Sequence, residues 1–198
     1  MSNPVYVTIA VEGPTDTPVA RRLLTHLGLE TGPIHETSGK VGLDKRLLGF
    51  NRAAANAPWL VLRDLDHDAP CPSELVKLLL PSPAIQMCFR IAVNEMEAWL
   101  LADREQLAKY LSITLKSVPL DPEQVENPKQ TLVNLARRSK RRSMREDIVP
   151  VEGTTAKVGP GYLARITEFA TYHWRPEIAA ETCRSLKRCL SSLGRWSS

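Results

Sequence analysis

One stretch, Trp59 to Asp68 (WLVLRDLDHD), constrains the fold more than any other. Its first four residues are apolar, as expected for a short buried strand. Carboxylates then follow at alternate positions, Asp64, Asp66 and Asp68. Alternate side chains of an extended chain point to the same side, so three like charges are predicted to lie together and repel one another unless a cation binds between them. The alternative is a strand end followed by a solvated acidic turn.

Strand-like and helix-like segments alternate through the first half of the chain. Strands are predicted at 5–11, 33–37, 59–65 and 85–93. Helices are predicted at 18–27, 43–55, 75–79 and 94–103. This order implies right-handed crossovers between parallel strands. The sequence therefore predicts an α/β protein with a mainly parallel four-stranded sheet flanked by helices, followed by a helical C-terminal extension with helices at 128–136, 161–173 and 176–193.

Carboxylates follow three of these predicted strands. Glu12 ends the first strand, Asp64 and Asp66 end the third, and Glu95 and Glu97 follow the fourth. Ligands of parallel sheets bind beyond the carboxyl ends of the strands, so these side chains are expected at one edge. Carboxylate oxygens are the preferred ligands of hard divalent cations, and the sequence predicts a site for Mg²⁺ or Mn²⁺ there.

Several of the neighbouring residues also have local explanations. Asp16 could bind the metal or cap the helix that follows it. Glu97 lies three residues after Asn94, which is the capping-box spacing. Asp68 could bind metal or solvate a loop, and Lys40 could reach a phosphate or be a solvated turn lysine.

Charge is distributed unevenly along the chain. The net charge is +4, with −3 in residues 1–130 and +7 in residues 131–198. Much of the positive charge lies in one run of basic side chains, Arg137, Arg138, Lys140, Arg141, Arg142 and Arg145. Such a run is expected either to contact nucleic-acid phosphates or to form a solvated surface.

Several classes of protein and site are disfavoured. No apolar run approaches the ~20 residues that span a membrane, and the N-terminus lacks the pattern of a signal peptide, so a cytoplasmic location is expected. The four cysteines form no CxxC pair and are predicted to be reduced thiols. Ala69 stands where an EF-hand calcium loop needs glycine, which excludes that motif. A DxDxT phosphatase is a weaker option because its acidic pair normally follows the first strand.

Two motifs carry a resemblance to a known domain. The segment Glu12-Gly13-Pro14-Thr15-Asp16 and the later Asp64-Leu65-Asp66 resemble the TOPRIM domain of DnaG-type primases, topoisomerases and overcoming-lysogenization-defect (OLD) nucleases. Three further motifs, at 94–103, 127–129 and 159–162, resemble a small bacterial TOPRIM-like family of unknown function. Its members are often encoded beside AAA-type ATPases, in the manner of phage-defence systems. The resemblance implies a TOPRIM-like domain over residues 1–110 and a basic helical extension over 111–198.

The resemblance also implies roles for individual residues. Glu12 would be the general acid/base or a metal-positioning residue, and Asp64 and Asp66 would bind metal. Asp16 and Glu95 would serve a second metal. The implied activity is metal-dependent phosphodiester cleavage of nucleic acid, with a possible AAA-type ATPase partner. The competing class is a non-catalytic partner or sensor subunit. It is favoured because the sequence offers no clear counterpart of a lysine that OLD nucleases carry late in the domain.

Overall fold

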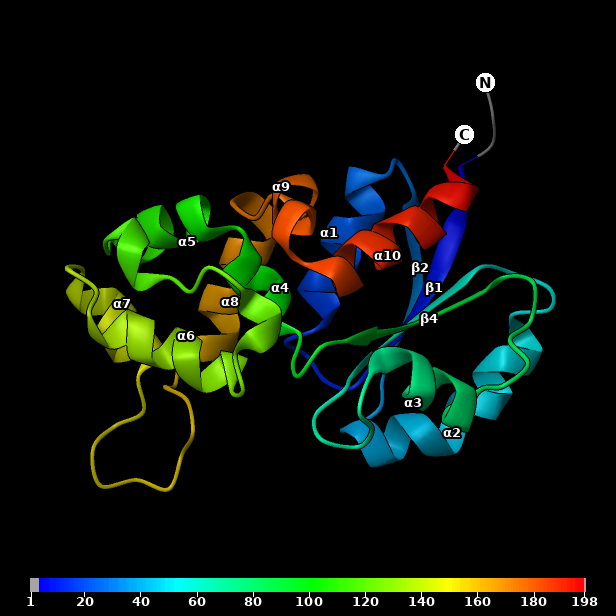
Figure 1. Cartoon of the computed structure of the whole chain (residues 1–198), viewed down its shortest axis with the longest axis horizontal. Helices are drawn as coiled ribbons and strands as arrows, with labels where there is room; N and C mark the ends of the chain where they lie inside the picture. Colours follow the sequence, from blue (N-terminus) through cyan, green and yellow to red (C-terminus); the bar gives the residue numbers. More distant parts are fainter. Residues whose placement is uncertain (1–3, 198) are drawn as a thin grey trace.

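A parallel sheet organises the chain, as the alternating pattern predicts. The computed structural model describes residues 4–197. Its strands are β1 (Tyr6–Val11), β2 (Glu30–Glu36), β3 (Trp59–Asp64) and β4 (Met87–Ala92), in the spatial order β2-β1-β3-β4. Every strand pair is parallel. The predicted α/β class with a four-stranded sheet flanked by helices is confirmed (Figure 1).

Helices cover both faces of this sheet because successive strand residues alternate between two apolar layers. On one face, α2 (Lys40–Ala53) and α3 (Pro72–Leu79) bury Val61, Phe89 and Ile91. On the other face, α1 (Thr17–His26) and α10 (Arg184–Leu193) cover Leu60, Leu62 and Cys88. The last long helix of the chain therefore completes a layer that begins with the first helix.

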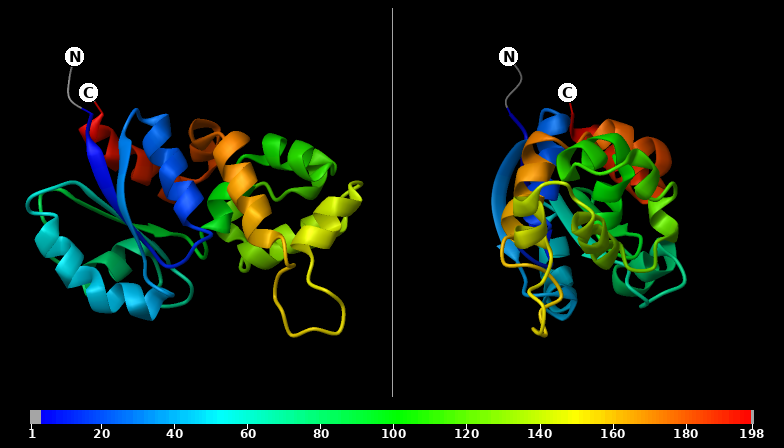
Figure 2. Two further views of the ribbon diagram at one scale, coloured as in Figure 1. Left: turned by 180° about the vertical axis from the view of Figure 1, so that it is seen from behind. Right: turned by 90° about the vertical axis from the view of Figure 1, so that its left-hand side faces the viewer.

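The remaining helices gather beyond the carboxyl ends of the strands. They are α4 (Glu97–Ala102), α5 (Arg104–Leu111), α6 (Pro128–Arg137), α7 (Arg142–Ile148), α8 (Tyr162–Tyr172) and α9 (Pro176–Thr182). Short 3₁₀ turns lie at Leu115–Ser117, Pro122–Gln124 and Gly194–Trp196. Helix α8 packs beside α1 (Figure 2), so the C-terminal part of the chain lies directly on the N-terminal part. None of the helices within residues 4–197 is long and apolar enough to cross a membrane.

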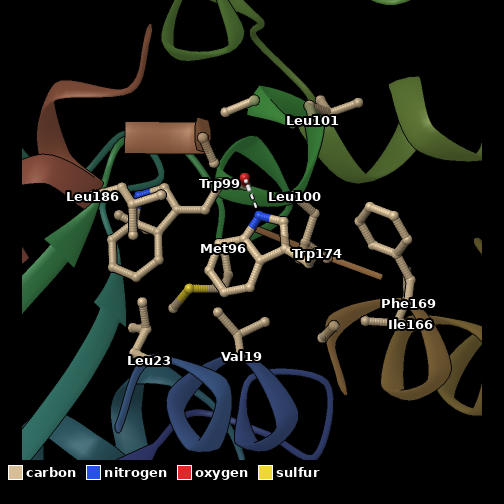
Figure 3. Close-up of a cluster of buried hydrophobic side chains, with 14 of the residues drawn as sticks. Val19, Leu23, Met96, Trp99, Leu100, Leu101, Ile166, Phe169, Trp174 and Leu186 are labelled. Atoms are coloured by element: carbon tan, nitrogen blue, oxygen red, sulfur yellow. Dashed lines mark hydrogen bonds between the residues drawn. The ribbon is translucent and has the colours of Figure 1, made fainter. Parts of the chain in front are cut away.

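Two tryptophans stand at the centre of the larger core. Trp99 of α4 and Trp174, between α8 and α9, are both fully buried. The Trp174 indole N–H donates to the backbone oxygen of Trp99 at 3.1 Å, and the Trp99 indole N–H donates to Ser185 Oγ at 2.7 Å. Val19 and Leu23 of α1 pack below them (Figure 3). Buried residues before and after residue 110 thus form one continuous core.

Some predicted boundaries are wrong. The helix expected from Asn94 begins at Glu97, because Asn94 adopts a left-handed conformation (φ 60°) and its side-chain amide donates to the Val125 carbonyl at 2.6 Å. The single helix expected over 176–193 is broken at Cys183, which is extended. The carboxylate of Glu123 accepts hydrogen bonds from the N–H groups that begin α10 there.

Candidate functional site

Four carboxylates from three segments meet at the carboxyl edge of the sheet. Glu12 and Asp16 come from the turn between β1 and α1, Asp64 ends β3, and Glu97 begins α4. Asp16 and Glu97 are buried, with 8% and 3% of their surface exposed. We call these four residues the acid cluster. Their proximity follows from the parallel topology, which brings the ends of β1, β3 and β4 to one edge.

Backbone N–H groups hold the acid cluster in place. The N–H of Asp64 donates to Glu12 Oε1 at 2.9 Å, which ties β3 to the end of β1. The N–H of Met96 donates to Asp64 Oδ1 at 2.8 Å, and the N–H of Gly13 donates to Asp16 Oδ2 at 2.9 Å. Asp16 therefore accepts a bond from its own turn, and it makes no side-chain cap of α1.

Two further residues, both from the C-terminal half of the chain, contact the acid cluster. Neither was predicted from the sequence to be a site residue. The Tyr162 hydroxyl donates to Glu97 Oε1 at 2.8 Å, and Lys129 Nζ lies 3.4 Å from the same oxygen. The backbone N–H of Lys129 also donates to Glu95 Oε2 at 2.8 Å, which places Glu95 beside the cluster. Glu97 thus pairs with distant partners and is not part of a capping box. Lys129 is the second residue of α6, after Pro128, and Tyr162 begins α8 after Gly161. Both lie in the motifs at 127–129 and 159–162, which are the signal in the sequence that could have identified them.

A close backbone approach positions Tyr162. A Cβ atom on the preceding residue, Gly161, would lie 2.6 Å from the Cβ of Asp147. Only glycine fits this approach without displacing α7. The Gly159-to-Tyr162 motif therefore has a packing explanation, which is to set the start of α8 against the acid cluster.

Burial and mutual repulsion raise the pKa of Glu12, Asp16 and Asp64. Desolvation by burial and the nearby Glu97 and Glu12 carboxylates raise the pKa of Asp16 to about 7. Burial, followed by the charges of Asp16, Glu97 and Glu12, raises the pKa of Asp64 well above its usual range. Burial likewise raises the pKa of Glu12 and of Glu95. Lys129 acts in the opposite direction on Asp16 and Asp64, but it does not cancel the repulsion.

The carboxylate oxygens of the acid cluster are the ligands that a hard divalent cation prefers. The side chains are not, however, arranged as the ligands of a single ion. Asp64, Glu12 and Glu97 each use one carboxylate oxygen in the bonds above, and their second oxygens accept no hydrogen bond from residues 4–197. No three His, Cys, Asp or Glu side chains in the described part of the chain are placed to hold a metal ion together. Binding Mg²⁺ or Mn²⁺ would therefore require these side chains to turn toward the ion, which would offset their mutual repulsion.

Asp66 and Asp68 do not continue the strand that ends at Asp64, so the extended conformation predicted for these three residues is wrong, while metal binding by Asp66 stays a prediction. Strand β3 ends at Asp64 and Asp66 has a positive φ of 47°, which breaks the extended alternation. Lys40 Nζ binds Asp66 at 2.8 Å and Asp68 at 2.9 Å, and buried Arg63 also binds Asp68 at 2.8 Å. Lys40 and then Arg63 lower the pKa of Asp68. These residues form a separate ion-pair network with Asp44, which Arg63 also binds.

The basic run lies on α6, α7 and the turn between them. Five of its side chains are exposed, namely Arg137, Arg138, Lys140, Arg141 and Arg142. Arg145 is partly buried and donates to the Ser139 carbonyl, while Arg142 pairs with Glu146 at 2.7 Å. Part of the run is therefore helical and is used in structure. Within residues 4–197, the side chains of Arg137, Arg138 and Lys140 make no hydrogen bond or ion pair and can face a partner.

The raised pKa of Asp16 predicts a pH-dependent stability. The folded state keeps a proton on Asp16 up to about pH 7, whereas the unfolded chain releases it near pH 4. Stability without metal should therefore fall as pH rises from about 4 to 7, by up to ~1.4 kcal/mol per pH unit for each such proton. Urea unfolding in EDTA at pH 5 and pH 8 measures this loss. Asp16→Asn should reduce it, and Glu152→Gln, on an exposed loop, should not.

Comparison with known proteins adds one structural likeness. No protein-family model matches the chain, and no curated protein matches it. Among solved structures the chain is similar to the C-terminal region of the Xanthomonas campestris pv. campestris OLD protein. The two share 14% sequence identity over 96% of each chain, with a TM-score of 0.38. A likeness of this size leaves the function to be argued from the residues of the site.

Proposed function

We propose that this chain is a divalent-metal-dependent nuclease. The observation that carries the proposal is the acid cluster, in which Glu12, Asp64 and Glu97 come from separate strand ends and each keep a second oxygen that accepts no hydrogen bond within residues 4–197. Glu12, Asp16, Asp64 and Glu97 would hold Mg²⁺ or Mn²⁺, with Glu95 adjoining. Bound ions would activate water and neutralise charge on the leaving oxygen of a phosphodiester.

The residues of the chain would supply the remaining steps. Burial raises the pKa of the Glu12 carboxyl above its ordinary value, which makes it a stronger base and suits a group that accepts a proton from water. Lys129 is a cation beside the cluster, with its side chain 34% exposed, and it would pair with a phosphate oxygen of the substrate. Asp66 is held by Lys40 and would act outside the metal site. The TOPRIM resemblance adds an AAA-type ATPase partner and a role in phage defence to the proposal.

A cleavage assay tests this function. Purified protein incubated with plasmid DNA, single-stranded DNA or RNA should cut at least one of them with Mg²⁺ or Mn²⁺ and none in EDTA. Lys129→Met should slow cutting without unfolding the chain. Absence of cutting with every metal and substrate, with and without an ATPase partner, would contradict the nuclease proposal.

A non-catalytic subunit is the second candidate. It is favoured by the hydrogen bonds that already hold each cluster carboxylate and by the lack of a ready three-ligand arrangement in residues 4–197. In that case the acid cluster would bind a cation for stability or sensing. Binding of Mg²⁺ or Mn²⁺ would then raise the melting temperature of the protein. Substitutions in the acid cluster would reduce this increase without affecting cleavage of nucleic acid, because the protein would cleave none.

The exposed arginines of the basic run are predicted to contribute to nucleic-acid binding. Replacing Arg137, Arg138 and Arg141 with alanine should weaken binding and reduce the slope of log K against log salt by up to about 3, because up to three phosphate contacts would be lost. Filter binding or anisotropy between 50 mM and 200 mM salt measures the slope. Alanines at Lys45, Arg46 and Arg52, exposed on α2, are the matched control. An unchanged slope in the first variant would assign the run to solvated surface.

A further inference from the structure

One edge of the sheet presents unpaired peptide groups. Strand β4 is an edge strand whose only strand neighbour is β3. The N–H groups of Trp59 and Leu65 donate to the carbonyls of Gln86 and Ala92, so the even-numbered peptide groups of β4 face β3. The N–H and C=O groups of Phe89 and Ile91 therefore point outward. Within residues 4–197 they have no hydrogen-bonding partner.

A groove follows this open edge. It encloses about 470 Å³ between α3 and α10, and Phe89, Ile91 and Val93 line it. Val76 of α3 adds to the apolar side. In Figure 1, β4 runs between α10 and α3, which form the two walls. The groove thus offers a strand edge, an apolar side and enough length for an extended segment.

The walls of the groove are cationic. Lys77 of α3, Arg90 of β4, and Arg184 and Arg188 of α10 all line it. Its one carboxylate, Glu123, accepts hydrogen bonds from the N–H groups of Arg184 and Ser185 at 3.1 and 2.8 Å and is directed at the start of α10. The groove therefore favours an occupant with negative side chains.

The opposite edge of the sheet differs. Strand β2 contains Pro33, which has no N–H to donate, and it begins and ends with Glu30 and Glu36. Proline and charged side chains are the features that protect exposed edges from pairing. Strand β4 has no proline, and its one charged side chain, Arg90, donates to Ser192 Oγ of α10, so the open pairing positions of Phe89 and Ile91 are not protected in the same way.

We propose that the β4 edge binds an extended acidic segment of a partner protein, which adds to the sheet as a fifth strand. The span from Phe89 to Val93 corresponds to about 13 Å of extended chain. A second copy of this chain is a poor occupant because pairing β4 with β4 would bring two sets of these cations together. Nucleic acid would satisfy the cations but would leave the peptide groups of Phe89 and Ile91 unpaired. This interaction is independent of the nuclease proposal.

Peptide binding tests the inference on the full chain. The probe is a fluorescent eight-residue peptide of alternating Glu and Val, with a Lys and Val peptide as the charge control. The acidic peptide should bind and the basic peptide should not. Lys77→Glu with Arg188→Glu, both exposed, should weaken binding at least 10-fold while the circular dichroism spectrum stays unchanged. The matched control is Lys45→Glu with Arg46→Glu on α2.

Pairing of the peptide backbone with the edge of β4 requires a separate experiment, because the charge variants do not test it. Two versions of the acidic peptide carry N-methyl groups at either the odd or the even positions, which removes alternate N–H donors. An added strand uses one set of donors and not the other, so one version should bind like the parent and the other at least 10-fold more weakly. Equal binding of the two versions would overturn strand addition. Displacement of the peptide by an oligonucleotide of equal charge at equal affinity would also overturn it, since the groove would then be a general polyanion site.

Discussion

Asp64→Asn is expected to abolish metal-dependent cleavage of nucleic acid and leave the chain folded. Asparagine keeps the oxygen that accepts the N–H of Met96, so the link between β3 and α4 persists. It removes the charge that lies between Asp16, Glu97 and Glu12 and would bind the ion. Loss of such a ligand should lower the rate at least about 10³-fold. Cutting by the variant at the wild-type rate would show that Asp64 is not in the active site.

The same variant should change thermal stability in a characteristic way. Without metal its melting temperature should equal or exceed that of the wild type, because one of several mutually repelling carboxylates is gone. The increase produced by Mg²⁺ or Mn²⁺ should be smaller than in the wild type. Asp66→Asn, two residues away, is the matched control because Asp66 pairs with Lys40 outside the acid cluster. An equal loss of cutting in Asp66→Asn would place Asp66 in the site.

Trp99→Ala is expected to produce the largest loss of stability. Trp99 is fully buried, and its backbone oxygen and indole bind Trp174 and Ser185. Truncating a buried tryptophan typically costs about 3–5 kcal/mol. At about 2–4 °C per kcal/mol for a chain of this size, the melting temperature should fall by roughly 6–20 °C. Tyr172→Ala, 78% exposed on α8, should change the free energy of unfolding by no more than about 0.5 kcal/mol.

The shape of the transition distinguishes one cooperative unit from two. Because the core around Trp99 and Trp174 includes residues of α1, α4, α8 and α10, both halves should unfold together. Far-UV circular dichroism and tryptophan fluorescence should then give the same midpoint in the wild type and in Trp99→Ala. Two separate midpoints would support the division of the chain near residue 110 into units that fold independently.

The sheet was predictable because its signals are local. The apolar run at Trp59 to Leu62 and the β-branched run ending at Val11 each identify a strand without help from the rest of the chain. The meeting of Glu12 with Asp64 then follows from the rule that the carboxyl ends of parallel strands lie at one edge of the sheet, whereas the strand order was not predicted. The helix boundaries that failed, at Asn94 and Cys183, are set by distant partners, Val125 and Glu123.

The details of the candidate site were less predictable because they also depend on residues far away in the sequence. Asp66 departs from Asp64 because a positive φ breaks the strand, and nothing in the Asp-Leu-Asp pattern specifies that angle. Lys129 and Tyr162 reach Glu97 across 32 and 65 positions of sequence. Such contacts depend on how α6 and α8 pack, so sequence spacing carries no direct signal for them.

The place of α10 in the fold has a consequence for how the protein is made. Helix α10 covers β4 and is synthesised long after it, because it follows β4 in the chain by many helices and turns. Until it emerges from the ribosome, a nascent chain that already contains β1 to β4 leaves one apolar face of β4, including Cys88, without its cover. Contacts between segments that are far apart in the sequence slow folding and prolong the exposure of apolar surface. Folding of this sheet can therefore be completed only after α10 has been synthesised, and chains shortened before α10 are expected to be targets for chaperones and proteases.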